Sequence, residues 1–417
     1  MIISFKPRIV LLYCFLFAGV FNDIIRLGDT QITLFRIMLP FVFVSTIMWS
    51  NKARRLYIVF LIIATISFVQ SVVFCSFNNA GVRFELSRYL TYLFYYFCIA
   101  TSIAAVIVIS ETETELFSLK FETFIILIGV CYLLVFMAIR HFDHARDYLN
   151  INNQNDYGAM LAMLCPVFFY KSKSQKRNIY LFFILLVLAY LVLNDCKLAL
   201  LGVCFQIVLI AYMRMRNRAQ NWRFLLFLPA LAIVAVFLYY LSDSNVMING
   251  YAWKQTVLEP IRAMLNGELY SQSNTSVTYR VNTFIVSIQW MIKTKFLGIG
   301  IGNSGVLVRN LLGSQSLYES WMVNNAVSLH NAFLEIGLEF GFVSLFGLII
   351  VIKSIVRTMR NRQMTNEESC FVVVTISSLL WLQGPSGILV DYLIFVTFTW
   401  LTIRNKHIRT ERNPDII

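Results

Sequence analysis

The sequence predicts an all-α polytopic membrane protein with about 12 transmembrane helices. Of its 417 residues, 58% are hydrophobic and only 14% are charged, whereas soluble domains are roughly half apolar and about a quarter charged. Apolar runs long enough to cross a bilayer recur along the whole chain. A transmembrane β-barrel would instead show short segments of alternating hydropathy.

Each span is placed where hydropathy peaks between short polar loops. Several of these spans are short, so their ends are approximate. The spans fall roughly at 8–25, 31–49, 56–75, 87–109, 121–139, 157–170, 179–194, 197–213, 223–241, 329–352, 369–384 and 387–403.

The distribution of basic residues predicts the orientation of the chain in the membrane. With both termini in the cytoplasm, the inner loops hold about 22 of the 35 Lys and Arg residues, as the positive-inside rule requires. The net charge of +13 is therefore explained by topology, and we do not expect a nucleic-acid partner.

This topology divides the chain into four segments. Residues 1–241 form a nine-span region, 242–328 a large outer loop, 329–403 a three-span region and 404–417 a basic cytoplasmic tail. Within the large loop, apolar residues recur at helical spacing and predict an amphipathic helix that lies on the membrane or packs on the bundle. This stripe consists of Val281, Phe284, Ile285, Ile288, Met291 and Ile292.

Polar residues open and interrupt the tenth span. A histidine is expected at the outer end of this span, and two glutamates within the apolar run are expected to form hydrogen bonds to a neighbouring span. A GxxxG pair allows close approach of another helix. Carboxylates inside a membrane are also functional candidates. The residues concerned are His330, Asn331, Glu335, Gly337, Glu339 and Gly341.

Three basic residues on the outer side abut long apolar runs, namely Arg36, Arg88 and Lys197. Their side chains could extend toward the membrane surface or bind an anion there. The run "LGIGIGNSG" at 297–305 does not have the G-x-G-x-x-G spacing of dinucleotide-binding loops. It predicts a tight turn, which can expose backbone N–H groups to an anion.

Metal ligands are not expected. The eight cysteines form no C-x-x-C pair, and "HFDH" at 141–144 has no further ligand nearby. We therefore predict neither a metal nor a cofactor.

Four stretches occur in the order "NQNDYGAMLAMLCP", "NDCKLALLG", "SVTYRVNTFIVSIQWMIKTKFLGIGIGNSG" and "SLHNAFLEIGLEFGFVSLFG". This set resembles the O-antigen polymerase and O-antigen ligase superfamily of bacterial membrane glycosyltransferases, which have a GT-C-like fold. The strongest motif is a His-Asn pair followed after nine residues by glycine, here His330, Asn331 and Gly341. Arg280 matches the family's arginine at the head of the amphipathic helix.

The resemblance implies a multi-pass protein of the bacterial inner membrane whose large loop is periplasmic. It implies a donor oligosaccharide on undecaprenyl pyrophosphate and metal-independent, inverting transfer, with a flippase and a chain-length regulator as candidate protein partners. The catalytic candidates are His330, as general base or orienting group, and Arg280. The candidates for binding pyrophosphate or sugar are Lys197, Arg36, Arg88 and Asn331, with Glu335, Glu339, Gly337 and Gly341 as structural residues.

Two departures from the family pattern bear on function. Ser344 stands where ligases tend to have Gly, Thr or Tyr, and Lys197 stands where the family usually has Arg. We favour a polymerase that joins repeat units, with a ligase that transfers polymer to lipid A core as the alternative. A lipid-linked oligosaccharide flippase belongs to another class; related halves, typical of many transporters, are not visible here.

Overall fold

The computed structural model divides the chain into two compact units. Unit 1 comprises 1–63, 94–210 and 363–417, and unit 2 comprises 64–93 and 211–362. The described residues are 7–20, 33–112, 154–175, 179–193, 197–217, 247–248, 251–252, 259–269, 275–313, 331–360 and 364–381, with the single positions 127, 130, 131, 134 and 329.

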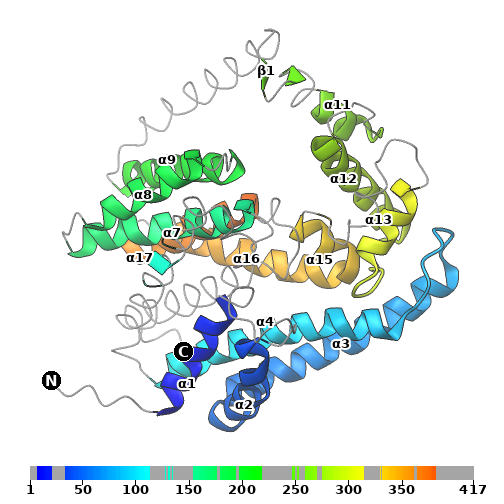
Figure 1. Cartoon of the computed structure of the whole chain (residues 1–417), viewed down its shortest axis with the longest axis horizontal. Coiled ribbons are helices and arrows are strands. Elements are labelled where there is room, and N and C mark those ends of the chain that lie inside the picture. The colour runs from blue at the N-terminus through cyan, green and yellow to red at the C-terminus, as the bar shows by residue number, and fades with distance from the viewer. Residues whose placement is uncertain are drawn as a thin grey trace. The chain divides into compact units, whose positions relative to one another are not determined.

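Helices dominate these described residues (Figure 1). They are α1 Pro7–Val20, α2 Leu34–Trp49, α3 Asn51–Phe77, α4 Leu86–Thr112, α7 Gln154–Gln175, α8 Ile179–Leu193, α9 Lys197–Asn217, α11 Glu259–Asn266, α12 Thr275–Lys293, α13 Ser304–Gly313, α15 Ala332–Phe340, α16 Phe342–Arg360 and α17 Asn366–Trp381.

The all-α expectation has one small exception in the described residues. Strands β1, Met247–Ile248, and β2, Tyr251–Ala252, pair antiparallel, with Met247 opposite Ala252. Two residues in each strand make a turn-sized hairpin, which leaves the helical character of the fold intact.

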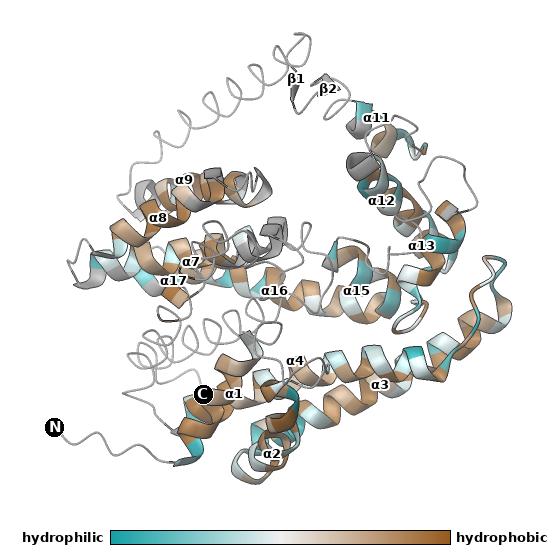
Figure 2. Cartoon of the chain, viewed as in Figure 1, coloured by the Kyte–Doolittle hydropathy of each residue, from teal (hydrophilic) through white to brown (hydrophobic). Residues whose placement is uncertain are grey.

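Three described helices are long and apolar enough to cross a membrane: Asn51–Phe77, Leu86–Glu111 and Phe342–Arg360. Shorter apolar helices accompany them, and Figure 2 shows hydrophobic residues along α3 and α8. This is the composition of a polytopic membrane protein. The predicted spans at 121–139, 223–241 and 387–403 lie largely or wholly outside the described residues.

Unit 1 is held together by aromatic and polar contacts between helices. Phe15 of α1 stacks on Phe35 of α2, with ring centroids 4.6 Å apart. The buried amide of Gln206 on α9 donates to the carbonyl of Ala162 on α7 at 3.2 Å and to the hydroxyl of Ser377 on α17 at 3.3 Å. Buried amides of this kind fix the register of neighbouring helices in an apolar environment.

The main hydrophobic core of the described part of unit 2 joins several helices. The end of α3, α12, α13 and α15 all contribute to it, and Phe74 meets Trp290 edge to face at 5.9 Å. Its fully buried members include Ile299, Leu307 and Leu338. Helices α12, α13 and α15 therefore form a core together with the end of α3, which is long and apolar enough to cross a membrane.

The amphipathic helix predicted in the large loop is present as α12, Thr275–Lys293, and it packs against α11, α13 and α15. The predicted apolar stripe is only partly its buried face, because Val281 and Ile285 are buried whereas Ile292 is 60% exposed. Polar residues Asn282 and Ser287 are fully buried. A helix packed on several sides buries more than one stripe.

The predicted tenth span at 329–352 is interrupted. Helix α15 ends at Phe340, Gly341 has φ +57°, and α16 then continues from Phe342 to Arg360. Hydropathy does not detect this break, because glycine is compatible with the apolar pattern of a continuous span.

Candidate functional site

The candidate site lies in unit 2, where a turn follows α12. Lys295 and Phe296 adopt the left-handed region, with φ of 53° and 58°. Such angles cost ordinary residues of order 1–3 kcal/mol each, so surrounding contacts must hold them. One such contact is the backbone N–H of Phe342, which donates to the carbonyl of Phe296 at 2.7 Å.

After this turn comes a segment that we call the glycine loop, residues 298–303. It runs along the end of α15, where the N–H of Ile299 donates to the carbonyl of Leu338 and that of Gly300 to the carbonyl of Glu339, both at 2.9 Å. These bonds satisfy carbonyls that the last turn of a helix leaves without partners. The loop therefore caps α15.

The opposite side of the glycine loop lies directly on α3. A Cβ atom at Gly300 would fall 1.9 Å from Ser71 Oγ and 2.5 Å from the Ser71 backbone nitrogen, and Gly300 has φ +81°. Only glycine allows this approach and this dihedral angle together. The N–H of Ile301 donates to Ser67 Oγ at 2.8 Å, so the loop is bonded to α3 as well as to α15.

A buried carboxylate completes the loop. Glu339 is fully buried, and its Oε1 accepts from the N–H of Gly302 at 2.9 Å and from the hydroxyl of Ser304 at 2.6 Å. Ser304 is the first residue of α13, and a helix N-terminus favours a negative charge. The carboxylate thus joins the end of α15 to the start of α13.

We predicted that this turn could offer backbone N–H groups to an anion. Those of Ile299, Gly300, Ile301 and Gly302 all donate within the protein, the last to Glu339 itself. These four N–H groups already have acceptors within the protein, so they are not open to an external anion.

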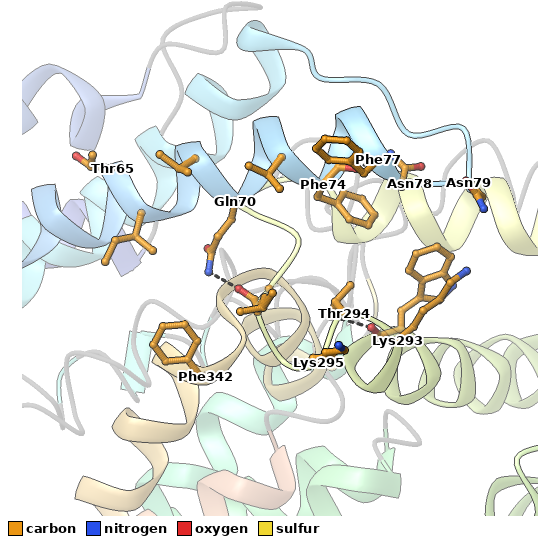
Figure 3. A pocket seen from close by; sticks show the side chains of 16 residues that line it. Thr65, Gln70, Phe74, Phe77, Asn78, Asn79, Lys293, Thr294, Lys295 and Phe342 are labelled. Carbon is orange, nitrogen blue, oxygen red and sulfur yellow. Dashed lines mark hydrogen bonds between the residues drawn. The ribbon is translucent and has the colours of Figure 1, made fainter.

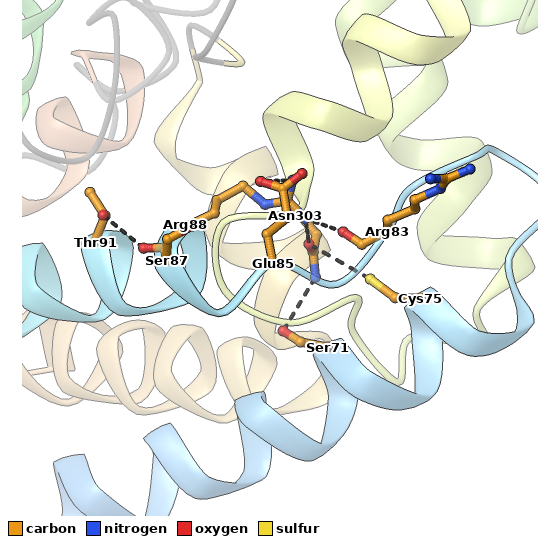
Figure 4. Close-up of polar contacts among 8 residues, drawn as sticks. All are labelled: Ser71, Cys75, Arg83, Glu85, Ser87, Arg88, Thr91 and Asn303. Atoms are coloured by element: carbon orange, nitrogen blue, oxygen red, sulfur yellow. Dashed lines mark hydrogen bonds and ion pairs between the residues drawn. The ribbon is translucent and has the colours of Figure 1, made fainter.

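Arg88 also contacts the glycine loop (Figure 4). Its Nη2 donates to Asn303 Oδ1 at 2.9 Å and to the carbonyl of Arg83 at 2.5 Å, and Nη1 lies 3.5 Å from Glu85 Oε2. Only 14% of the Arg88 side chain is exposed. Asn303 in turn donates from Nδ2 to Ser71 Oγ at 3.2 Å. This network connects the α3–α4 hairpin to the loop.

The two glycines of the predicted GxxxG pair contact different neighbours. A Cβ at Gly337 would lie 3.0 Å from Met291 Cε of α12, which is the expected close helix approach. Gly341 instead ends α15, and a Cβ there would lie 2.2 Å from the carbonyl oxygen of Phe296. At Gly341 the close neighbour is a turn and not a helix.

The other predicted residues of unit 2 have distinct environments. Arg280 lies on α12 with an exposed side chain, and Glu335 is buried in the first turn of α15. Asn331 caps α15, because its Oδ1 accepts from the N–H of Leu334 at 3.1 Å. An N-cap asparagine satisfies a donor that the helix leaves open.

Two of the predicted residues belong to unit 1, and a third lies outside the described residues. Arg36 is half-buried in the first turn of α2, and Lys197 is the first residue of α9, both in unit 1. His330 lies outside the described residues. In the described part of the chain, no three His, Cys, Asp or Glu residues gather in a way that could hold a metal ion.

Sequence reasoning missed the polar face of α3. Ser67, Gln70 and Ser71 follow each other at i, i+3 and i+4, so they share one side of the helix. All three contact the segment after α12, with Gln70 Nε2 donating to the carbonyl of Leu297 at 2.5 Å. The spacing of these polar residues within an apolar span was the available signal.

The glycine loop and its hydrogen bonds form a rigid support beside the last turns of α3. A glycine loop that bonds to α3, α13, α15 and the α3–α4 hairpin can hold neighbouring groups in fixed positions. Such preorganisation is what electrostatic stabilisation of a reacting group requires.

Comparison with known proteins gives this arrangement a family context. Residues 181–349 match the family model for O-antigen ligase. No curated protein matches the chain. The matched segment contains α12, the glycine loop and α15, together with the His330–Asn331 pair.

The match supports a membrane enzyme of polysaccharide biosynthesis, with O-antigen polymerase or ligase activity in the broad sense. Residues 181–349 thus form an O-antigen ligase family region, which confirms the resemblance of this chain to the O-antigen polymerase and ligase superfamily.

Proposed function

We propose that this protein is a polymerase that joins oligosaccharide repeat units carried on undecaprenyl pyrophosphate into a surface polysaccharide. The family match at 181–349, which includes the His-Asn pair and the glycine loop, carries the assignment to O-antigen polymerase or ligase activity. Ser344, which stands where ligases tend to have Gly, Thr or Tyr, favours the polymerase of the two. The enzyme would work at the periplasmic face of the inner membrane, with about twelve spans, a large periplasmic loop and both termini in the cytoplasm.

The contact between the α3–α4 hairpin and the large loop is compatible with this sidedness. The charge pattern assigns the hairpin and the large loop to the same outer side of the membrane. Arg88 of the hairpin bonds to Asn303 of the loop at 2.9 Å, and two segments can bond in this way only if they share a side.

In the proposed reaction, a hydroxyl of the acceptor sugar attacks the anomeric carbon of the donor. The bond between that carbon and the diphosphate oxygen breaks, and undecaprenyl diphosphate leaves with the bonding electrons. His330 would take the hydroxyl proton, since an imidazole titrates near neutral pH. Arg280 would stabilise the charge that develops on the diphosphate, in place of a metal.

The basic residues differ in how well their surroundings suit contact with the diphosphate of the donor. Arg280 has an exposed side chain on α12, which favours contact with a donor. Arg88 is largely enclosed and already donates to Asn303 and Arg83, which favours a role in bracing the loop. Lys197 and Arg36 remain candidates for binding the pyrophosphate.

A ligase is the second candidate, because the matching family model carries that description. In the structure, the hydroxyl of Ser344 donates to the carbonyl of Gly341 at 2.6 Å, beside the break between α15 and α16. A flippase receives no support from the family match.

Deletion of the gene, followed by gel analysis of surface polysaccharide, separates these functions. Loss of a polymerase leaves single repeat units on the cell surface, and this is the expected result. Long polymer stranded on the lipid carrier would indicate a ligase, and repeat units trapped in the cytoplasm would indicate a flippase. Re-expression of the intact chain must restore the normal ladder in each case.

A further inference from the structure

Unit 2 contains a groove of about 750 Å³ between the end of α3 and the turn that follows α12 (Figure 3). The start of α16 also contributes to it through Phe342. This volume falls within the range of small-molecule and cofactor sites. All of its lining residues belong to unit 2.

One side of the groove is apolar and belongs to a membrane-spanning helix. Val69, Val73 and Phe77 of α3 line it, and they are 55%, 52% and 83% exposed. The lining runs along α3 from Thr65 to Phe77, which is ~18 Å at the rise of an α-helix. This is a little over half the ~30 Å hydrocarbon thickness of a bilayer, so the groove has the length of one leaflet.

The other end of the groove is polar and basic. Lys293, the last residue of α12, and Lys295, in the turn that follows, line it together with Asn78 and Asn79, which come directly after α3. The Lys293 ammonium lies 4.1 Å from the centroid of the Trp290 ring. No carboxylate occurs among the residues that line the groove, so the two lysines give this end a net positive charge.

We propose that this groove binds an anionic glycerophospholipid of the surrounding leaflet. One acyl chain lies along Val69 and Val73, and the phosphate lies near Lys293 and Lys295. Lysine suits this ligand because an ammonium binds phosphate as a point charge without demanding a fixed orientation. An undecaprenyl chain is much longer than the groove, which favours the membrane phospholipid over the donor as the occupant.

Lipid binding here would act on the glycine loop. Lys295 is in the left-handed region, and the next residue, Phe296, accepts from the N–H of Phe342. The adjacent carbonyl of Leu297 accepts from Gln70 on the opposite side of the groove. A phosphate bound by Lys295 therefore contacts the turn from which the glycine loop begins, whatever reaction the protein catalyses.

The test uses the full chain in a neutral detergent, titrated with phosphatidylglycerol and with phosphatidylcholine of identical acyl chains. The number and affinity of bound lipids are measured by native mass spectrometry. Phosphatidylglycerol should bind more tightly, since a basic residue near an anionic lipid contributes about 1 kcal/mol, which is roughly fivefold in affinity. Equal affinity for the two lipids would overturn the proposal.

Variants locate the site. Lys293→Gln together with Lys295→Gln should weaken phosphatidylglycerol binding by roughly 30-fold, and Val73→Trp should abolish tight binding by filling the groove. The charge-matched control is Lys353→Gln with Arg357→Gln, and the volume-matched control is Leu345→Trp; these residues lie on α16 and do not line the groove. Loss of binding in the controls, or retention in the groove variants, would contradict the assignment.

Competition with undecaprenyl phosphate tests the choice of lipid. The phospholipid should remain bound when the polyprenyl lipid is added at equal concentration. Displacement by the polyprenyl lipid would identify the groove as a donor site and would refute the phospholipid assignment. Melting temperatures of all variants in the same detergent establish that each is folded.

Discussion

The carboxylate of Glu339 accepts a hydrogen bond of 2.6 Å from the hydroxyl of Ser304, and the same oxygen accepts from the N–H of Gly302 at 2.9 Å. Glu339 is the penultimate residue of α15, and Ser304 begins α13. One buried oxygen atom therefore holds two helices and the glycine loop together.

Replacement of Glu339 should destabilise the fold in proportion to the number of bonds lost. We expect Glu339→Leu to lower the free energy of unfolding by about 3 kcal/mol, because two donors lose a charged acceptor. Glu339→Gln keeps an acceptor oxygen and should cost about 1 kcal/mol. Thermal unfolding in detergent measures both, with exposed Glu268→Gln as the control. Unchanged stability in Glu339→Leu would show that these bonds contribute nothing.

Gly300 should not tolerate a side chain. We expect Gly300→Ala to destabilise the protein by more than about 3 kcal/mol, because its Cβ would overlap both Ser71 Oγ and the Ser71 backbone. Gly347→Ala is the matched control, since nothing lies within 4 Å of a Cβ there and alanine favours a helix. Yield and melting temperature are compared. A Gly300→Ala protein as stable as Gly347→Ala would mean that the loop does not lie on α3.

The contact between Arg88 and Asn303 should appear as an energetic coupling. We expect the double variant Arg88→Ala/Asn303→Ala to lose about 1 kcal/mol less free energy of unfolding than the two single variants lose together. The reason is that either single substitution already breaks the bond, so the second substitution does not lose it again. Unfolding of the four proteins in denaturant provides the cycle. Strict additivity would exclude the bond. Arg309→Ala in place of Arg88→Ala serves as the uncoupled control.

Activity should depend on Arg280 and His330 separately from stability. Arg280→Ala is expected to slow chain extension by about 10²–10³, as removal of one electrostatic stabiliser typically does, and His330→Ala should abolish it. Arg280→Lys should recover only part of the loss, since lysine lacks the planar fork. Polysaccharide ladders in the deletion strain report these rates, with inserted protein quantified on blots.

Arg262→Ala is the matched control for Arg280→Ala, because Arg262 is also exposed and lies on the neighbouring helix α11. It should give a normal ladder. Normal ladders from Arg280→Ala or His330→Ala, with protein present in the membrane, would remove that residue from the proposed reaction.

Local patterns in the sequence predicted several helices closely. The spans expected at 56–75 and 87–109 correspond to α3 and α4, and the helix in the large loop is present as α12. Hydropathy and helical periodicity depend on the residue itself and its near neighbours, so both are readable without tertiary information. The O-antigen family resemblance was likewise present in short motifs and is confirmed by the match at 181–349.

The sequence did not show which residues, distant along the chain, contact each other in the fold. It identified Glu339 as a buried carboxylate but could not name Gly302 and Ser304 as its partners, more than thirty positions away in the chain. It also assigned Gly341 to a helix pair, whereas the turn at Phe296 approaches it and requires a break. Composition alone determined that this chain enters a membrane through apolar helices. The tertiary structure decided where those helices end, because a helix end depends on the distant backbone groups that pack against it.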